Sequence, residues 1–507
     1  MELTYSVFRD KVRGCFIGKS VGGTLGAPFE CRRGVFDIEH YTQPLEGTAF
    51  PNDDLDLQLV WLNAVERFGR RVDAAILGEY WLSYIVPCWS EYGAGKNNLR
   101  MGFPPPFSGA VCNDNRDSCG AFIRSEIWAC LAPGHPELAV EYAYRDASVD
   151  HAGEGVYAEL FTAALQSAAF MENDRQRLLD IALSYIPDDC AVRKAVDLVR
   201  ECYAQRLDWR EVRRKILITF PTHFGMMAGY IDQEPEPDIP DGPIGYDAPA
   251  NIALTVLALL YGEGEFGETV CLAARCGEDA DCTAATAAAT LGIMYGTAGI
   301  PARWTEPIGE AIVTVSINRA DADCRIPGTI DQLTDRVIQA AAHFLDPGLV
   351  RFSTSEEPFI LQMAAGSEAL FNNGRYQAPG PYTLLQEFPL MEVRVNLGQA
   401  PFLMPGKVFN IQVDVDNRMR CQQWLRLQWL GAEGFSISPG QDTLQPLEQY
   451  HGNIGHASFA FTLKAPEVLE KPLYELVLAI YVNGRHSKYY IPITLIYAPS
   501  AGKELKA

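Results

Sequence analysis

Apolar residues recur at intervals of three and four positions along most of the chain up to residue 345. This spacing collects them on one face of a helix. Loops rich in proline and glycine, such as the FPPPF run at 103–107, interrupt the pattern. The clearest helical stretches are 57–65, 74–85, 155–170, 193–203, 252–261 and 330–345. The pattern predicts an all-α domain over residues 1–346.

From residue 385 to 500 the pattern changes, and apolar and polar residues alternate in short runs. The runs read VRVNL, VFNIQVDV, WLRLQWL, ASFAFTLKA, YELVLAIYV and YYIPITLIY, and turn residues separate many of them. Alternation with a period of two is typical of strands that cover one side of a core. These residues are predicted to form an antiparallel, immunoglobulin-like β-sandwich. Residues 347–384 have no clear period and are predicted to be a linker.

Length and charge narrow the class of protein. A chain of 507 residues exceeds the size of a single hydrophobic core, which agrees with two domains. Its formal net charge of −22 provides no basic surface for nucleic acid. The N-terminal residues have no apolar leader, and no run of 18 apolar residues occurs, so we expect a soluble, cytoplasmic protein without a membrane partner. The 13 cysteines form no CxxC pairs and are expected to be free thiols.

Two acidic clusters carry the candidate chemistry. Residues 52–56 read NDDLD just before a predicted helix, and residues 277–283 read GEDADCT at the start of an alanine-rich one. Acids in a first helical turn commonly act as caps, which is the simpler interpretation of either cluster alone. Two such clusters can also converge on a hard cation such as magnesium. A further pair, Asp321 and Asp323, precedes no small-residue helix and is expected to lie in a solvated loop.

Further segments accompany these clusters in a distinctive order. Residues 13–30 read RGCFIGKSVGGTLGAPFE, followed later by GAFIR at 120–124, ASVDH at 147–151, GY at 245–246 and IPARW at 300–304. In order and spacing the set resembles the ADP-ribosylglycohydrolases, the family that includes dinitrogenase reductase-activating glycohydrolase. The family's opening helix reads G-x-x-x-G-x-x-x-G-D-A-L-G-x-P-x-E, and its acidic motifs read T-D-D-T and G-G-D-T-D-T-x-A-A. The resemblance covers residues 9–345 and leaves out the sandwich.

The resemblance implies a helical fold, a cofactor and a set of site residues. The implied cofactor is Mg²⁺, as two ions, with Mn²⁺ as an alternative. The implied metal ligands are Asn52, Asp53, Asp54, Asp279, Asp281 and Cys282. The implied catalytic residues are Glu30, Asp54 and Asp279, with Glu30 expected to move protons. The implied substrate-binding residues are Gly120, Arg124, His151, Gly245 and Tyr246.

Five positions depart from the family pattern. Leu55, Ala280 and Cys282 each stand where the family has a threonine, and Asn52 does so with an amide oxygen that can still bind a cation. Gly23 replaces the aspartate of the opening helix. The sulfur of Cys282 is a soft ligand poorly suited to magnesium. The departures predict an altered metal affinity or substrate.

The resemblance therefore implies a magnesium-dependent hydrolase. Its expected reaction is cleavage of the glycosidic bond between ADP-ribose, or a related ribosyl group, and an acceptor. The expected partner is a small molecule containing ADP-ribose or an ADP-ribosylated protein. Two alternatives remain open, a non-catalytic binding or structural protein that retains the fold and a metal-dependent hydrolase of another glycoside. The sandwich is expected to bind carbohydrate or protein, or to mediate self-association, and its residues do not decide which.

Overall fold

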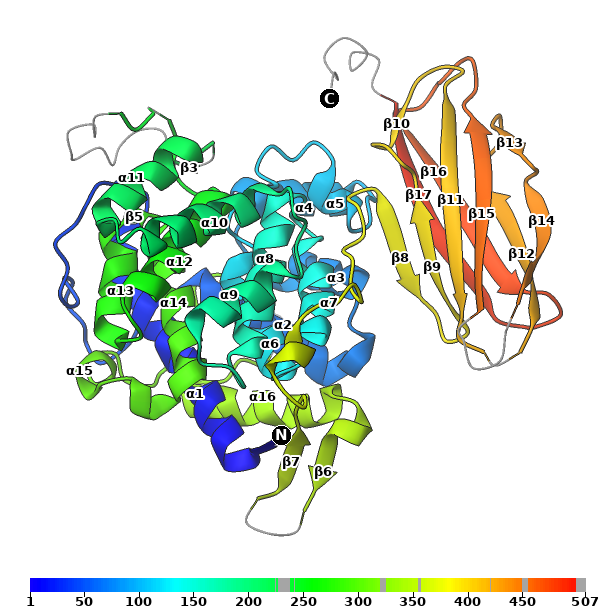
Figure 1. Cartoon of the computed structure of the whole chain (residues 1–507). Helices are drawn as coiled ribbons and strands as arrows, with labels where there is room; N and C mark the ends of the chain where they lie inside the picture. The colour runs from blue at the N-terminus through cyan, green and yellow to red at the C-terminus, as the bar shows by residue number, and fades with distance from the viewer. Residues whose placement is uncertain are drawn as a thin grey trace. The chain divides into compact units, whose positions relative to one another are not determined.

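The chain divides into two structural units, and the second unit takes residues from two separate parts of the sequence. The computed structural model describes residues 1–223, 225–226, 238–240, 242–319, 325–353, 357–419, 421–448 and 455–497. The first unit comprises Met1–Lys96 and Asn113–Ala378, and the second comprises Asn97–Cys112 and Pro379–Ala507. Figure 1 shows a helical first unit and a second unit built from strands.

Helices dominate the first unit, and all six stretches predicted from the apolar spacing are helical. None of the helices in the described ranges is long and apolar enough to cross a membrane. The main helices are α1 (Tyr5–Gly26), α2 (Asp53–Phe68), α3 (Ala74–Tyr84), α4 (Ser90–Arg100), α6 (Glu126–Leu131), α7 (Pro136–Ala147), α8 (Glu154–Ala168), α9 (Arg175–Leu183), α10 (Ala191–Ala204), α11 (Trp209–Thr219), α12 (Ala248–Tyr261), α13 (Phe266–Arg275), α14 (Ala280–Tyr295), α15 (Ala302–Thr305) and α16 (Ile330–Phe344). Helix α4 begins in this unit and ends in the second.

Local sequence sets where several of these helices begin. The side chain of Asp73 accepts a hydrogen bond from the backbone N–H of Ile76 at the start of α3. Thr329 caps α16 in the same way through the N–H of Gln332. Such caps satisfy backbone donors that have no partner within the helix.

The closest helix pair joins α1 to α14, which lie side by side in Figure 1. Glycines recur at every fourth position of α1, and they place backbone against backbone. A methyl group added at any of them would lie 2.3–2.5 Å from a carbonyl oxygen of α14. Small side chains on both helices therefore allow an approach that larger ones would prevent. The residues in contact are Gly14, Gly18, Gly22 and Gly26 on α1 and Ala280, Ala284, Ala288 and Gly292 on α14.

The segment predicted as a linker, 347–384, contains regular structure. Strands β6 (Val350–Phe352) and β7 (Phe359–Gln362) pair with each other, and β7 also pairs with β1 (Glu2–Thr4) at the N-terminus. Leu361 and Leu370 are fully buried. The pattern was too short to reveal these elements, because strands of three or four residues give too few alternations to count.

The second unit contains two five-stranded sheets that enclose one apolar core (Figure 1). One sheet has the order β10-β17-β16-β12-β14 and the other the order β13-β15-β11-β9-β8, and only the β10–β17 pair is parallel. The predicted sandwich of antiparallel strands is thus confirmed. Its strands are β8 (Thr383–Glu387), β9 (Met391–Asn396), β10 (Phe402–Leu403), β11 (Val408–Asn417), β12 (Gln423–Leu430), β13 (Ser436–Ser438), β14 (Asp442–Leu447), β15 (Gly455–Lys464), β16 (Leu473–Val482) and β17 (Lys488–Tyr497).

The segment Asn97–Cys112 belongs to the core of this second unit, although the sequence places it within the helical part of the chain. Phe103, Phe107 and Val111 are buried in the same apolar cluster as the strands. The hydroxyl of Thr494 on β17 donates a hydrogen bond to the carbonyl of Gly102 at 2.7 Å. The predicted domain boundary at residue 385 omits this segment, because a proline-rich loop carries no sign of a distant partner.

Candidate metal centre

The two acidic clusters meet in the first unit, as their sequence pattern predicts. Asn52 caps α2, so Asp53 and Asp54 lie in the first turn of that helix. Asp279 is the residue before α14, and Asp281 lies in its first turn. Short strands β2 (Arg32–Arg33) and β5 (Gly277–Glu278) pair just before α14. This pairing brings the end of the opening segment, with Glu30, to the start of α14.

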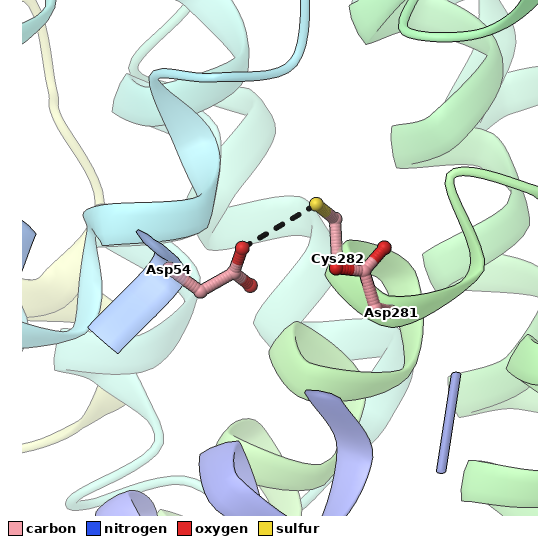
Figure 2. Close-up of side chains that lie close together, drawn as sticks. All are labelled: Asp54, Asp281 and Cys282. Carbon is pink, nitrogen blue, oxygen red and sulfur yellow. Dashed lines mark hydrogen bonds between the residues drawn. The ribbon is translucent and has the colours of Figure 1, made fainter. Parts of the chain in front are cut away.

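Two groups of ligand atoms result, and they share Asp281. Glu30, Asp279 and Asp281 each present an oxygen within 4.8 Å of the others, and we call this group the carboxylate position. Asp54, Asp281 and Cys282 form a second group of the same dimensions, which we call the mixed position. In Figure 2, Asp54 from α2 faces Asp281 and Cys282 from α14. The thiol of Cys282 donates to Asp54 Oδ1 at 3.4 Å.

The carboxylate position has unsatisfied acceptors. Oδ1 of Asp279 and Oδ1 of Asp281 are buried and have no hydrogen-bond partner. Buried polar atoms are rarely left without one, so each oxygen here is available to a cation. The set of oxygens suits Mg²⁺ or Mn²⁺.

Burial and neighbouring charges raise the pKa values of the clustered acids. Burial, together with the charges of Glu30 and Asp53, raises the pKa of Asp281 to about 7. Burial, together with the charge of Asp53, raises the pKa of Glu30 to about 7. Burial and the charge of Asp281 raise the pKa of Asp279 well above its ordinary value. Each pKa is raised because burial and neighbouring negative charges disfavour the ionised carboxylate. A bound divalent cation would favour the ionised form again.

Two of the predicted metal ligands have other partners. The amide of Asn52 donates from Nδ2 to Asp281 Oδ2 at 3.0 Å and accepts at Oδ1 from the N–H of Asp54 at 2.8 Å. Its oxygen is therefore used as a helix cap, and Asn52 orients Asp281. Oδ2 of Asp53 accepts from the hydroxyl of Tyr92 at 2.8 Å, and Asp53 belongs to neither group.

The sequence did not predict Lys19 as a residue of the site. In the structure its side chain forms an ion pair with Asp54. Its ammonium is buried and lies 3.0 Å from Asp54 Oδ2 and 3.2 Å from Glu126 Oε1. Burial alone would lower the pKa of Lys19, but these two carboxylates raise it above its ordinary value. Asp54 and Glu126 are 35 and 107 positions away, so no local pattern could have revealed the cluster.

Glu30 sits at the edge of the site, next to Tyr246. It follows a short 3₁₀ turn, Ala27–Phe29, and is partly exposed. The hydroxyl of Tyr246 donates to Glu30 Oε1 at 3.2 Å and accepts from the thiol of Cys31 at 2.9 Å. Tyr246 thus lies at the centre, where the sequence predicted a substrate-binding residue.

Arg124 and His151, which the sequence predicted to bind substrate, are both buried. Arg124 has no exposed surface, and its guanidinium pairs with Asp146 at 2.9 Å and Asp150 at 2.6 Å. His151 is buried, with Nδ1 at 2.9 Å from Asp150 and Nε2 at 3.1 Å from Ser118 Oγ. Burial alone would raise the pKa of Asp150, but Arg124 and His151 hold it at about 2. These residues form a neutralised core cluster. Asp146 lies in the last turn of α7 and Asp150 lies beyond its end, so helical spacing did not reveal this cluster.

Two predicted glycines are also enclosed. Gly120 is buried, and an added methyl group would lie 2.2 Å from Glu91 Oε1, so its backbone faces protein. The N–H of Gly245 donates to Glu278 Oε2 at 3.1 Å. The N–H of Gly245 is therefore already paired within the protein. Asp321 and Asp323 lie outside the described residues.

A thiol next to Asp279 is a further residue that the sequence did not reveal. Cys119 is buried and donates to Asp279 Oδ2 at 2.5 Å, leaving Oδ1 as the carboxylate's unpaired atom. The N–H of Asp279 is held by Asn251 Oδ1 at 3.3 Å. The first contact holds the carboxylate of Asp279, and the second holds its backbone.

Comparisons with known proteins identify what the chain is similar to. The family model described as ADP-ribosylglycohydrolase matches residues 4–343. A solved structure titled "ADP-ribosylglycohydrolase-related protein complex" is 19% identical, with a TM-score of 0.44, and the match covers 67% of this chain and 100% of that one. A FixG-related protein from Vibrio parahaemolyticus is 15% identical, with a TM-score of 0.17, over 21% of this chain and 94% of that one. Among curated protein sequences, none matches.

The family match extends over more than half of the chain and contains every residue of the candidate centre. It makes the protein a hydrolase of the glycosidase class. More particularly, the chain belongs to the ADP-ribosylglycohydrolase family, as residues 13–30 and the two acidic clusters predict.

Proposed function

We propose that this protein hydrolyses the glycosidic bond between ADP-ribose, or a related ribosyl group, and an acceptor, with a divalent cation bound at the carboxylate position. The observation that carries the proposal is the convergence of Glu30, Asp279 and Asp281 within 4.8 Å, with two buried oxygens left unpaired. Mg²⁺ fits this set because it prefers oxygen ligands, and Mn²⁺ fits it similarly.

Asp279 and Asp281 would hold the ion, and each is already oriented by the protein. The thiol of Cys119 fixes the first carboxylate, Asn251 holds the backbone N–H of Asp279, and the amide of Asn52 fixes the second carboxylate. When bound, the cation would orient the ribose hydroxyls and polarise the attacking water.

Glu30 would take the proton from that water. It is partly exposed, it lies within 4.8 Å of the two aspartate oxygens, and its pKa of about 7 lets it exchange a proton near neutral pH. As the anomeric carbon–acceptor bond breaks, the bond from the water oxygen forms, and the acceptor leaves with a proton. The hydroxyl of Tyr246 holds Glu30 in place for this step.

Hydrolysis assays would test the proposal directly. ADP-ribose linked to an acceptor through a nitrogen and through an oxygen would each be incubated with the protein and Mg²⁺, and free ADP-ribose would be measured. We expect release with at least one linkage, loss of release on chelation, and at least a hundredfold lower kcat in Glu30→Gln. Glu39→Gln, an exposed acid on the following loop, is the matched control. Equal turnover with and without chelator would contradict the metal role, and equal turnover in Glu30→Gln would contradict the proton transfer.

A further inference from the structure

The buried ammonium of Lys19 occupies one side of the candidate metal centre, and its consequences concern how many ions the centre holds. Nζ lies 3.0 Å from Asp54 and 3.2 Å from Glu126, and it also donates to the carbonyl of Ile123 at 2.5 Å. Glu126 in turn accepts from Gln58 and Gln166. Lys19 is therefore fixed by a full set of acceptors, and it cannot turn away from Asp54 without leaving its charge buried and unpaired.

The two candidate positions differ in what they can offer a cation. The carboxylate position presents three carboxylates, two of them with an unpaired buried oxygen. In the mixed position, Asp54 has one oxygen next to Lys19 and the other against the thiol of Cys282. Sulfur is a poor ligand for magnesium or manganese. The neighbouring residue Leu55 has no ligand atom.

The cavity beside Lys19 supplies no further carboxylate for a second ion. A cavity of about 20 Å³ lies against Lys19, Gly23, Asn52 and Asp54. Among the described residues that line this cavity Asp54 is the one carboxylate, and neither Asp281 nor Cys282 reaches it. Because residue 23 is a glycine, helix α1 contributes no carboxylate there.

We infer that the ammonium of Lys19 takes the place of a second metal ion, so that the centre binds one divalent cation at the carboxylate position. The inference rests on the proposed metal-dependent function and specifies its stoichiometry. A divalent ion bound to Asp54 would lie a few ångströms from a fixed positive charge in a buried setting, where repulsion between like charges is strong. Asp54 then neutralises Lys19, and the ligands of the ion are Asp279 and Asp281, with Glu30 beside them.

Manganese titration of the full chain tests this inference without relying on activity. Bound Mn²⁺ per chain would be measured by equilibrium dialysis, and its electron paramagnetic resonance spectrum recorded. We expect one ion per chain with the hyperfine-resolved spectrum of an isolated ion. Two ions per chain within about a hundredfold in affinity, with an exchange-coupled spectrum, would overturn the inference. No bound ion at all would instead overturn the proposed metal dependence, which separates the two failures.

A double variant and a control test whether Lys19 is the reason that the centre binds one ion. Lys19→Met combined with Cys282→Thr removes the ammonium and supplies a hydroxyl, so a second Mn²⁺ should bind. Lys11→Met on the same helix is the control, since Lys11 donates to the carbonyls of Ile293 and Met294, and it should keep one ion. A folded double variant that still binds a single ion would refute the role of Lys19.

Asp54→Asn tests the same assignment even if the double variant does not fold. Because Asp54 is not a ligand of the single ion, its loss should change Mn²⁺ affinity by less than about tenfold. Asp279→Asn should weaken it by at least a hundredfold. Equal, large losses in both variants would overturn the assignment.

Discussion

The variant Gly22→Ala tests whether the close contact between α1 and α14 stabilises the fold and positions the candidate metal ligands. The new methyl carbon would lie 2.3 Å from the carbonyl oxygen of Ala284, where ordinary contacts begin at 3.4 Å. The helices would have to separate by roughly 1 Å, and overpacking of this kind costs about 1–3 kcal/mol. Alanine recovers about 1 kcal/mol through its helix propensity. We expect a net loss of up to about 2 kcal/mol in the free energy of unfolding.

Gly23→Ala is the matched control, one residue further along the same helix. It gains the same helix propensity, but the nearest atom to its methyl group is the side-chain amide nitrogen of Asn52 at 3.2 Å. A side chain can move by a few tenths of an ångström where a backbone cannot. We expect this variant to be within about 0.5 kcal/mol of the unmodified protein, or more stable.

Urea denaturation followed by far-ultraviolet circular dichroism would measure both variants. Because α14 begins just after Asp279, separating the helices should also displace Asp279 and Asp281 from Glu30, so Mn²⁺ affinity should fall in Gly22→Ala. If Gly22→Ala unfolded at the same urea concentration as Gly23→Ala, the proposed backbone contact would not limit the fold.

Three further outcomes are expected. Asp281→Asn should abolish metal binding and turnover while the apo protein stays folded, because Asp281 belongs to both ligand groups; retained binding in a metal titration would contradict this. Burial and neighbouring acids raise the pKa of Asp281 to about 7, so the folded apo state keeps a proton that the unfolded chain releases. Apo stability should therefore fall as pH rises from 3.8 to about 7, and Mg²⁺ should remove the loss; a urea midpoint that does not change with pH in the presence of chelator would exclude it. Deleting residues from 379 onward should expose Phe103, Phe107 and Val111 and cause aggregation, which replacing 101–111 by a Gly/Ser linker should relieve; light scattering that detects only monomer in the simple truncation would rule this out.

Much of the fold could be predicted because its signals are local. Apolar residues three and four apart predicted α10 and α16, and strict alternation predicted β11 and β12. The β6–β7 pair was missed because its strands are short. The segment Asn97–Cys112 was missed because its apolar partners lie almost 300 positions later, and a sequence pattern records no such pairing.

The acidic part of the site was predictable, whereas its positive charge was not. Asp54 and Asp281 stand at helix starts with recognisable motifs, and the structure brings them together. Lys19 lies on a glycine-rich helix with no acid beside it in sequence. Arg124 was assigned to substrate through its motif, but the structure gives its guanidinium two buried aspartates instead. Charge pairing in a folded core depends on distances that the sequence does not contain.

The shared core of the second unit also affects how the protein is made. A ribosome synthesises Asn97–Cys112 long before the strands that enclose it, since roughly 270 residues separate Cys112 from Pro379. At about 5–20 residues per second, this delay is about 15–50 s. Throughout that time Phe103 and Phe107 have no apolar partner on the nascent chain. Cotranslational folding of the helical unit must therefore proceed with an uncovered hydrophobic loop, and that loop is where a chaperone of the nascent chain would bind.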